Sequence, residues 1–244
     1  MSLFLTLAYL FFLGSCFGWL LELVFRRFFS SANPERKWIN PGFCTGPYLP
    51  LYGSGLCVLF LIASLEDMHL LGSNPALNRA GLFIAMAVCM TVIEYIAGVI
   101  SLQVFKVRLW DYRNEWANLQ GIICPKFSLF WALLGGLYYF AVHPFILDAL
   151  RWLSQNLAFS FVIGFFFGVF TIDVCHSAQI IAKMRRFAVD HQVVLRYENV
   201  KTHIRAIHDR NAQKYHFFRP FHSDLGLTAH LKELLDTFEK RVKP

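Results

Sequence analysis

Five long apolar runs constrain this chain more than any other feature of its sequence. They cover roughly residues 3–25, 48–65, 80–105, 126–146 and 157–182. An α-helix needs about 20 mainly apolar residues to cross the hydrocarbon core of a bilayer. Each run is close to that length. Because lipid offers no hydrogen-bonding partners, every backbone group must pair within the protein, which favours helices over open strands. We therefore expect an all-α polytopic protein with five transmembrane helices, forming a transmembrane bundle over residues 1–182.

The composition agrees with residence in a membrane. Hydrophobic residues make up 56% of the 244 residues and charged residues only 16%, whereas soluble domains carry about 25% charged residues. This excludes a disordered chain and a freely soluble enzyme. The six cysteines occur singly, with no CxxC pair, so neither a disulfide framework nor a zinc motif is predicted.

The distribution of Lys and Arg predicts the orientation of the bundle. Loop 26–43 and loop 106–126 carry four basic residues each, and the chain after residue 182 carries thirteen of the 23. Cytoplasmic loops are enriched in Lys and Arg. We therefore expect the N-terminus outside and the C-terminus in the cytoplasm. The net charge of +7 then follows from topology, and no nucleic-acid partner is needed to explain it.

Residues 183–244 differ from the bundle and are predicted to form a short, basic, helical cytoplasmic tail. Two sets of apolar residues at helical spacing mark its helices: Val193, Tyr197, Val200, Ile204 and Ile207, then Leu231, Leu234, Leu235, Phe238 and Val242. The intervening residues 215–222 are aromatic and basic, as is typical of a membrane surface. The pattern leaves two structures open, a tail on the headgroups and a hairpin packed on itself.

Ionisable residues inside the apolar runs mark candidate functional positions, because a charge in hydrocarbon costs several kcal/mol. The runs contain Glu22, Glu94, Asp173 and His176. Glu22 precedes Arg26 by one helical turn, so the two could pair at the interface. Glu94 lies about 18 Å along a helix from Lys106, which is too far for a similar ion pair at the interface.

Glu94 also lies on a stripe of small or polar residues. The stripe consists of Ala87, Thr91, Glu94, Gly98 and Ser101. Small residues permit close approach of helices in membranes, so we expect the stripe to face other helices. Glu94 should then point inward and have a partner, either for function, which we favour, or for a structural hydrogen bond.

Asp173 and His176 are three residues apart and can share one helix face. The same run contains a second small-residue stripe, expected to pack on neighbouring helices with Asp173 nearly opposite: Gly164, Gly168, Thr171, Cys175 and Ala178. Together with the two glutamates, Asp173 and His176 have the residue types of a carboxylate-bridged metal bundle. Such bundles use a second carboxylate–His pair, which this sequence lacks, so we expect no metal and no cofactor. If a metal were bound, the candidate ligands would be Glu22, Glu94, Asp173 and His176.

Two segments rich in Gly, Pro and aromatic residues, 39–53 and 109–116, lead toward the second and fourth spans. Gly and Pro resist an uninterrupted helix, and non-helical backbone at membrane depth must be buried in protein or line a wet cavity. The surrounding order is repeated: Glu22 precedes Asn40, Gly42 and Cys44, as Glu94 precedes Asn118, Gly121 and Cys124. Either the chain contains two related helix–loop–helix units, or the match is coincidental because such residues are common in loops.

Several of these motifs together carry a family resemblance. They are residues 18–22 (GWLLE), residues 42–53 (GFCTGPYLPLYG), Glu94-Tyr95, and Trp110-Asp111-Tyr112 followed by Asn118 and Gly121. Over about residues 10–175 the chain resembles the ABC-transporter type IV family of bacterial membrane proteins. The resemblance implies a transport role in the bacterial inner membrane. Two positions depart from the family pattern, Ile122 in place of a basic residue and Gln103 in place of a glutamate.

The leading functional hypothesis is a permease-like protein with an acidic and aromatic cavity open to the cytoplasm. The residues predicted to bind substrate are Glu22, Tyr48, Tyr52, Glu94, Trp110, Asp111, Tyr112, Asn118 and Asp173. Such a site suits an organic cation, a proton or a metal ion better than an anion. The sequence contains no GxxxxGK[ST] phosphate loop, so ATP-driven transport would require a separate ATPase subunit. A homo-oligomer in the lipid bilayer is compatible with this interpretation.

Two other functions remain open. One is a membrane enzyme that acts on a lipid or isoprenoid substrate, with a buried carboxylate as acid or base and Asp111 or His176 as its partner. No recognised catalytic signature such as HExxH is present, which leaves enzymatic activity undecided. The other is a scaffold that binds partners through residues 183–244.

Overall fold

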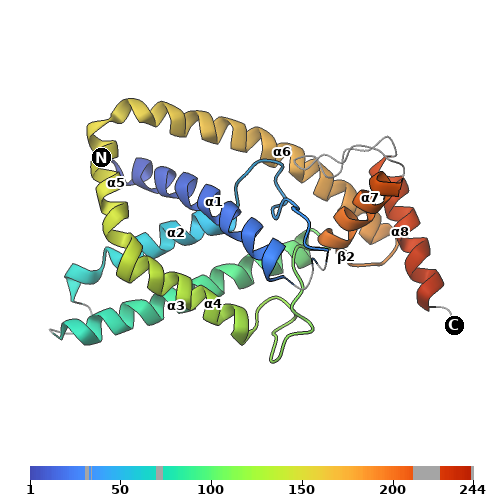
Figure 1. Cartoon of the computed structure of the whole chain (residues 1–244), viewed down its shortest axis with the longest axis horizontal. Coiled ribbons are helices and arrows are strands. Elements are labelled where there is room, and N and C mark those ends of the chain that lie inside the picture. The colour runs from blue at the N-terminus through green and yellow to red at the C-terminus, as the bar shows by residue number, and fades with distance from the viewer. Residues whose placement is uncertain (31–32, 34, 70–73, 211–225, 243–244) are drawn as a thin grey trace. The chain divides into compact units, whose positions relative to one another are not determined.

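The computed structural model describes residues 1–30, 33, 35–69, 74–210 and 226–242, and it confirms the all-α prediction (Figure 1). The helices in chain order are α1 (Leu3–Phe28), α2 (Pro50–Ala63), η1 (Glu66–Met68), α3 (Pro75–Val99), η2 (Ile100–Val104), α4 (Pro125–Leu137), η3 (Tyr138–Val142), α5 (His143–Gln155), η4 (Leu157–Phe159), α6 (Ser160–Asp190), α7 (Tyr197–Arg210) and α8 (Leu227–Val242). Two short strands, β1 (Val107–Arg108) and β2 (Leu195–Arg196), pair in parallel, with Val107 opposite Leu195.

Five helical segments are long and apolar enough to cross a membrane. They are Leu3–Phe28, Pro50–Met68, Pro75–Val104, Pro125–Gln155 and Leu157–Asp190. These segments coincide with the five predicted spans, so the prediction of a multi-pass membrane protein is confirmed. The orientation of the termini stays a prediction.

The fourth span differs from its predicted end. The apolar run ends near residue 146, but the π-helical turn η3 leads directly into α5, and helical structure continues to Gln155. Pro144 lies in the first turn of α5 and, having no backbone N–H, interrupts the hydrogen-bond ladder that continues from η3. A π-turn beside a proline is a usual cause of a change in helix direction.

The chain divides into two compact units, each described below by itself. Unit 1 consists of Met1–Glu22, Pro47–Ala97 and Tyr112–Thr171. Unit 2 consists of Leu23–Gly46, Gly98–Asp111 and Ile172–Pro244. The proposed boundary between a bundle and a tail at residue 182 stays a prediction.

Glycines in unit 1 bring α1 and α2 to close contact. Gly14 and Gly18 lie one helical turn apart on α1. A Cβ atom at Gly14 would lie 2.8 Å from the Cβ of Leu56, and one at Gly18 would overlap the side chain of Tyr52. Glycines four positions apart are a usual way for membrane helices to approach one another. The first turn of α2 is therefore held against the middle of α1.

The two faces of α3 have the polarity expected of a membrane helix. Its buried face contains Leu82, Met86, Met90 and Glu94, and its exposed face contains Ile84, Val88, Val92 and Ile96. The ionisable residue is thus inside and β-branched aliphatic residues are outside, the reverse of a helix in water. The predicted stripe is correct at Glu94, Gly98 and Ser101, which are buried, whereas Ala87 and Thr91 are only partly buried.

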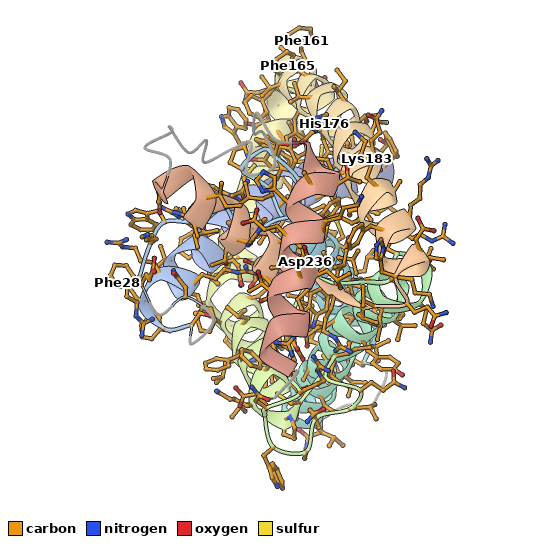
Figure 2. All side chains as sticks on the ribbon, turned by 90° about the vertical axis from the view of Figure 1, so that its right-hand side faces the viewer. Phe28, Phe161, Phe165, His176, Lys183 and Asp236 are labelled. Atoms are coloured by element: carbon orange, nitrogen blue, oxygen red, sulfur yellow. The ribbon has the colours of Figure 1, made fainter. Side chains whose placement is uncertain are left out.

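The packing stripe predicted on α6 is wrong. Its five small residues, 164, 168, 171, 175 and 178, are all exposed, and the space beside Gly164 and Gly168 is open. Phe161 and Phe165 are likewise exposed and point away from the ribbon (Figure 2). An aromatic face of α6 packs inward instead: Phe166 lies 4.8 Å from Phe12 of α1, measured between ring centroids.

Both amphipathic helices predicted in the tail are present in unit 2. On α7, Tyr197, Val200, Ile204 and Ile207 are buried, as their spacing predicts. On α8, Leu231 is buried in the same apolar cluster, with Leu234 and Leu235 packed against it. The side chains of Phe238 and Val242 and the aromatic segment 215–222 lie outside the described residues. The packing of α7 with α8 in one cluster favours the hairpin over the tail spread on headgroups.

A buried lysine joins α7 to the segment before α2. Lys201 is 2% exposed, and its Nζ donates to the carbonyl oxygens of Asn40 and Gly42, both at 2.9 Å. Burial lowers the pKa of Lys201 to about 8, while the nearby Glu198 carboxylate opposes that shift. Burial alone would raise the pKa of Glu198, but the charges of Arg26 and Lys201 hold it below its usual value.

We expect Gly18→Ala to destabilise the protein, because the added methyl group forces α2 away from α1. Overpacking of this kind costs about 1–3 kcal/mol. The matched control is Gly168→Ala on α6, where a methyl group meets no atom within 4 Å, so it should be neutral or slightly stabilising. Thermal unfolding in detergent measures both variants. Equal unfolding temperatures for the two would contradict the close crossing of α1 and α2.

We expect Lys201→Met to destabilise unit 2 because it leaves the Asn40 and Gly42 carbonyls without their donor. An unsatisfied buried acceptor costs about 1–3 kcal/mol. Lys183→Met, at an exposed position of α6, removes the same charge without removing these contacts and should be close to neutral. Limited proteolysis and thermal unfolding compare the two. If both variants behave alike, Lys201 does not hold the segment.

The lowered pKa of Lys201 also predicts how stability changes with pH. The folded-state value of about 8 lies below the ordinary 10.5, so between these values the unfolded chain binds a proton that the folded chain has released. The free energy of unfolding from this group therefore rises with pH over that window. The neutral amine still has N–H groups for both carbonyls.

The measurement is the difference in unfolding free energy between wild type and Lys201→Met, taken at about pH 7 and about pH 9.5. Because the variant lacks the titrating group, all other groups cancel to first order. We expect the advantage of the wild type to grow at the higher pH. A constant or smaller difference would refute the assigned direction.

Candidate functional site

Glu94 is the centre of the candidate site in unit 1. Its side chain lies on the buried face of α3 and is 3% exposed. The hydroxyl of Tyr112 donates a hydrogen bond to Glu94 Oε1 at 3.0 Å. The other oxygen, Oε2, is buried and makes no hydrogen bond within the described part of the chain. The expected inward direction and the expected partner are therefore both observed.

Tyr112 is positioned by the loop before α4 and by one aromatic ring. Its ring stacks on Phe127 of α4, with centroids 4.2 Å apart and planes 9° apart. Its backbone N–H donates to the Gly121 carbonyl at 2.9 Å. Burial raises the pKa of Tyr112 well above its usual value, and the negative charges of Glu94 and Glu22 raise it further. The hydroxyl is therefore a permanent donor at neutral pH.

A second carboxylate–tyrosine pair forms between α1 and α2. The hydroxyl of Tyr52 donates to Glu22 Oε2 at 2.9 Å. Gly18 makes this pair possible, because its missing side chain leaves room for the Tyr52 ring against α1. Glu22 lies one turn further along the same face of α1. Within unit 2, Arg26 forms an ion pair at 2.7 Å with Glu198 of α7, and the pairing of Arg26 with Glu22 suggested by the sequence stays a prediction.

Trp131 of α4 connects the two carboxylate–tyrosine pairs. Its ring lies 5.1 Å from that of Tyr52, measured between centroids, and its indole N–H acts as a hydrogen-bond donor toward the Glu94 carboxyl. The charge of Glu22 acts on the same carboxyl. Glu22, Tyr52, Glu94, Tyr112 and Trp131 thus form one group, which we call the carboxylate–tyrosine site.

Two other predicted residues of unit 1 have structural surroundings. Asn118 Oδ1 accepts a hydrogen bond from the Gly121 N–H at 2.9 Å, and its Nδ2 donates to the Glu115 carbonyl at 2.9 Å. Asn118 therefore shapes the loop that carries Tyr112. Tyr48 is 4% exposed and packs edge-on against Phe166 and Phe170 of α6.

Asn40 of unit 2 has the same local role as Asn118. Its Oδ1 accepts from the Gly42 N–H at 3.2 Å, and its Nδ2 donates to the Thr45 carbonyl at 2.9 Å. Each asparagine thus holds a loop that follows a glutamate-bearing helix, in agreement with the repeated order in the sequence. The interpretation as two related units stays a prediction.

The remaining predicted residues, Trp110, Asp111 and Asp173, belong to unit 2. Asp111 forms an ion pair with Arg196 of β2 at 2.9 Å. Asp173 accepts hydrogen bonds from the backbone N–H groups of Thr45, at 3.0 Å, and Gly46, at 2.7 Å. Both acids hold polypeptide segments of unit 2 together.

The metal alternative named from the sequence combines residues of both units. Glu22 and Glu94 lie in unit 1, and Asp173 and His176 lie in unit 2. His176 is exposed on α6, as labelled in Figure 2. A metal held by these four residues therefore stays a prediction.

Physical reasoning from the sequence did not identify Trp131, which belongs to the site, or Phe127, which supports Tyr112. Both look like ordinary members of the apolar run 126–146. They lie four positions apart, so they share the face of α4 that meets the two tyrosines. Amphipathic aromatic residues one turn apart, at the start of a span that follows a polar loop, are the signal that could have indicated them.

The chemistry of the carboxylate–tyrosine site is that of an acceptor for positive charge. Two carboxylates provide acceptor oxygens, and two tyrosine hydroxyls provide donors. The rings of Tyr52 and Trp131 add aromatic surface, which attracts organic cations. An anion placed here would meet two carboxylates of its own sign.

Comparison with known proteins agrees with the motifs. Residues 9–178 match the family model described as "Putative ABC-transporter type IV". No curated protein and no solved structure matches the chain. The matched region includes all five residues of the carboxylate–tyrosine site and covers well over half of the chain. The chain therefore belongs to the family described as Putative ABC-transporter type IV.

Proposed function

We propose that this protein is the membrane-spanning component of a transport system and that its carboxylate–tyrosine site binds a positively charged species. Family membership supports a transport role. The observation that carries the site assignment is Glu94, which is buried in a membrane helix and has an oxygen, Oε2, that accepts no hydrogen bond from the described residues.

The buried carboxylate of Glu94 is costly in free energy. An ionised group in the middle of a membrane helix costs several kcal/mol unless it is paired. The Tyr112 hydroxyl compensates one oxygen of Glu94. A proton or a cation at Oε2 would neutralise the charge of Glu94 and give this oxygen a partner. Binding of such a species is favourable because it removes the cost of a buried, unneutralised carboxylate.

The surrounding rings favour an organic cation as the substrate and a proton as the exchanged species. A metal ion would need several more oxygen or nitrogen ligands around Glu94. An organic cation needs one carboxylate and aromatic faces, which Tyr52 and Trp131 provide on the Glu22 side of the site. Binding of the cation and release of a proton from Glu94 would then be coupled by charge repulsion.

Energy for ATP-driven transport would come from a partner. The sequence contains no phosphate loop of the GxxxxGK[ST] type, so this chain does not supply that ATPase motif itself. We propose a separate ATPase subunit and a membrane orientation with the C-terminus in the cytoplasm, as the distribution of Lys and Arg predicts. The bacterial inner membrane is the proposed location.

We expect Glu94→Gln to weaken binding of an organic cation by at least about tenfold, which corresponds to about 1.4 kcal/mol. The amide keeps the shape and the acceptor for Tyr112 but carries no negative charge. The probe is tetraphenylphosphonium, added to purified protein in detergent, with binding measured by calorimetry and proton release by a pH electrode in weak buffer.

The matched control is Glu115→Gln, which removes a carboxylate that pairs with Lys126 in the loop before α4, at 3.0 Å. This variant should bind the cation and release protons like the wild type. Retention of full binding by Glu94→Gln would remove the central residue of the proposal. Conversion of added lipids by the purified wild-type protein, without an energy source, would favour the lipid enzyme instead.

A further inference from the structure

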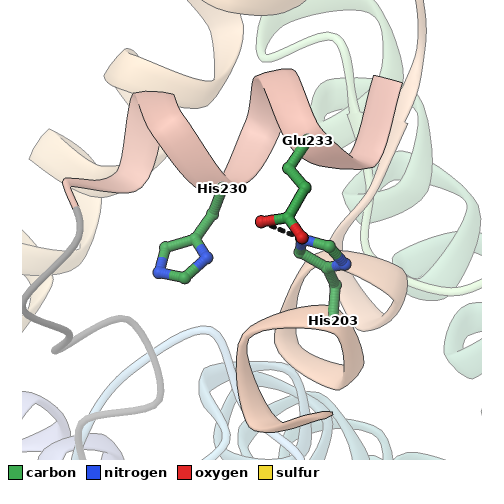
Figure 3. Close-up of side chains that lie close together, drawn as sticks. All are labelled: His203, His230 and Glu233. Carbon is green, nitrogen blue, oxygen red and sulfur yellow. Dashed lines mark ion pairs between the residues drawn. The ribbon is translucent and has the colours of Figure 1, made fainter. Parts of the chain in front are cut away.

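We propose that His203, His230 and Glu233 form a binding site for a divalent transition metal, and that zinc is the ion that fits it best. One nitrogen from each histidine and one oxygen of Glu233 lie within 4.8 Å of one another. Figure 3 shows the three side chains, with His203 on α7 and the other two on α8. The site lies entirely in unit 2 and is independent of the proposed transport function.

The ligand-bearing helices are held in place by buried neighbours. Ile204 follows His203 on α7, and Leu231 follows His230 on α8. Both apolar side chains are fully buried, at 0% exposed, and both belong to the same apolar cluster. His230 and Glu233 are three residues apart and therefore share one face of α8. The three candidate ligands thus come from two helices that already pack together.

The three ligand atoms must move slightly closer together to bind one ion. His203 Nε2 and Glu233 Oε2 are 3.8 Å apart, and the two imidazole rings are nearly perpendicular, at 84°, with centroids 6.0 Å apart. Ligand atoms on a tetrahedral zinc ion lie about 3.3 Å apart, given bonds of about 2.0–2.1 Å. The widest separation must therefore shrink by about 1.5 Å. The Glu233 side chain, 49% exposed, can rotate to allow this.

The types of ligand select the class of metal. Two imidazoles and one carboxylate suit zinc and its neighbours in the first transition row, whereas calcium and magnesium prefer oxygen ligands alone. Three protein ligands leave a fourth tetrahedral position for water. The half-exposed Glu233 side chain indicates that solvent reaches this side of the cluster.

The consequence of binding is a cross-link between α7 and α8. The three ligands are assembled only when the two helices pack, so the binding free energy stabilises that packing. Lys201 and Tyr197 of α7 hold the segment that includes residues 40–43, through the Asn40, Gly42 and Phe43 carbonyls. Zinc would therefore stabilise both the tail hairpin and the part of unit 2 that depends on α7.

The test uses the full-length protein without a histidine tag, stripped with a chelator and dialysed. Zinc is added in competition with a chromophoric zinc indicator. We expect one zinc ion per chain and an increase in unfolding temperature. Glu233→Gln and His203→Ala should weaken binding by about 100-fold or more, since loss of even an outer-shell partner of a metal ligand costs about 10–100-fold.

His191→Ala is the matched control, because it removes an exposed histidine of unit 2 and should leave zinc affinity unchanged. X-ray absorption of the zinc-loaded wild type should show two imidazole nitrogens and oxygen ligands at about 2.0–2.2 Å. It also tests the site without a variant that could unfold. The proposal is overturned if the wild type binds no zinc at micromolar concentrations, or if Glu233→Gln and His203→Ala bind it as tightly as His191→Ala does.

Discussion

Hydrocarbon offers no hydrogen-bonding partner, so every acid inside this bundle depends on the protein for its donors. Glu94 takes one from Tyr112 and Glu22 takes one from Tyr52. Each tyrosine needs its own support: Tyr52 reaches Glu22 because Gly18 lets two helices touch, and Tyr112 is held flat against Phe127. The close helix crossing and the aromatic stack are therefore parts of one arrangement, whose result is a pair of carboxylates inside an apolar bundle.

The same constraint explains why α7 is tied to the segment before the second span. Residues 40–46 are not helical, so their backbone groups have no helical partners. The Lys201 ammonium satisfies two of their carbonyl groups, and the Asp173 carboxylate satisfies two of their N–H groups. The basic C-terminal tail therefore supplies hydrogen-bond donors to a segment that precedes it by about 160 residues.

The length of the apolar runs predicted the five spans, and residue spacing along one helix predicted the inward direction of Glu94 and the buried seam of α7. Spacing along one helix did not predict which side chains pack or pair when they belong to segments far apart in the sequence. Gly164 and Gly168 could face either a helix or lipid, and the inner side of α6 is instead formed by Phe166, Phe167 and Phe170, which pack against α1. The ion pair of Arg26 with Glu198 joins residues that are far apart in the sequence. His203 and His230 meet only through the pairing of α7 with α8.

Asp173 shows what a structural acid in this chain looks like, and the comparison with Glu94 supports a functional role for the latter. Both Asp173 oxygens accept hydrogen bonds, Oδ1 from the Thr45 N–H and the Ser177 hydroxyl, and Oδ2 from the Gly46 N–H. Glu94 is buried on α3, yet its Oε2 accepts none from the described residues. Buried polar atoms in folded proteins are nearly always satisfied, and exceptions concentrate at functional sites. A species that brings positive charge to Oε2 would remove this exception, whereas further burial of apolar surface could not.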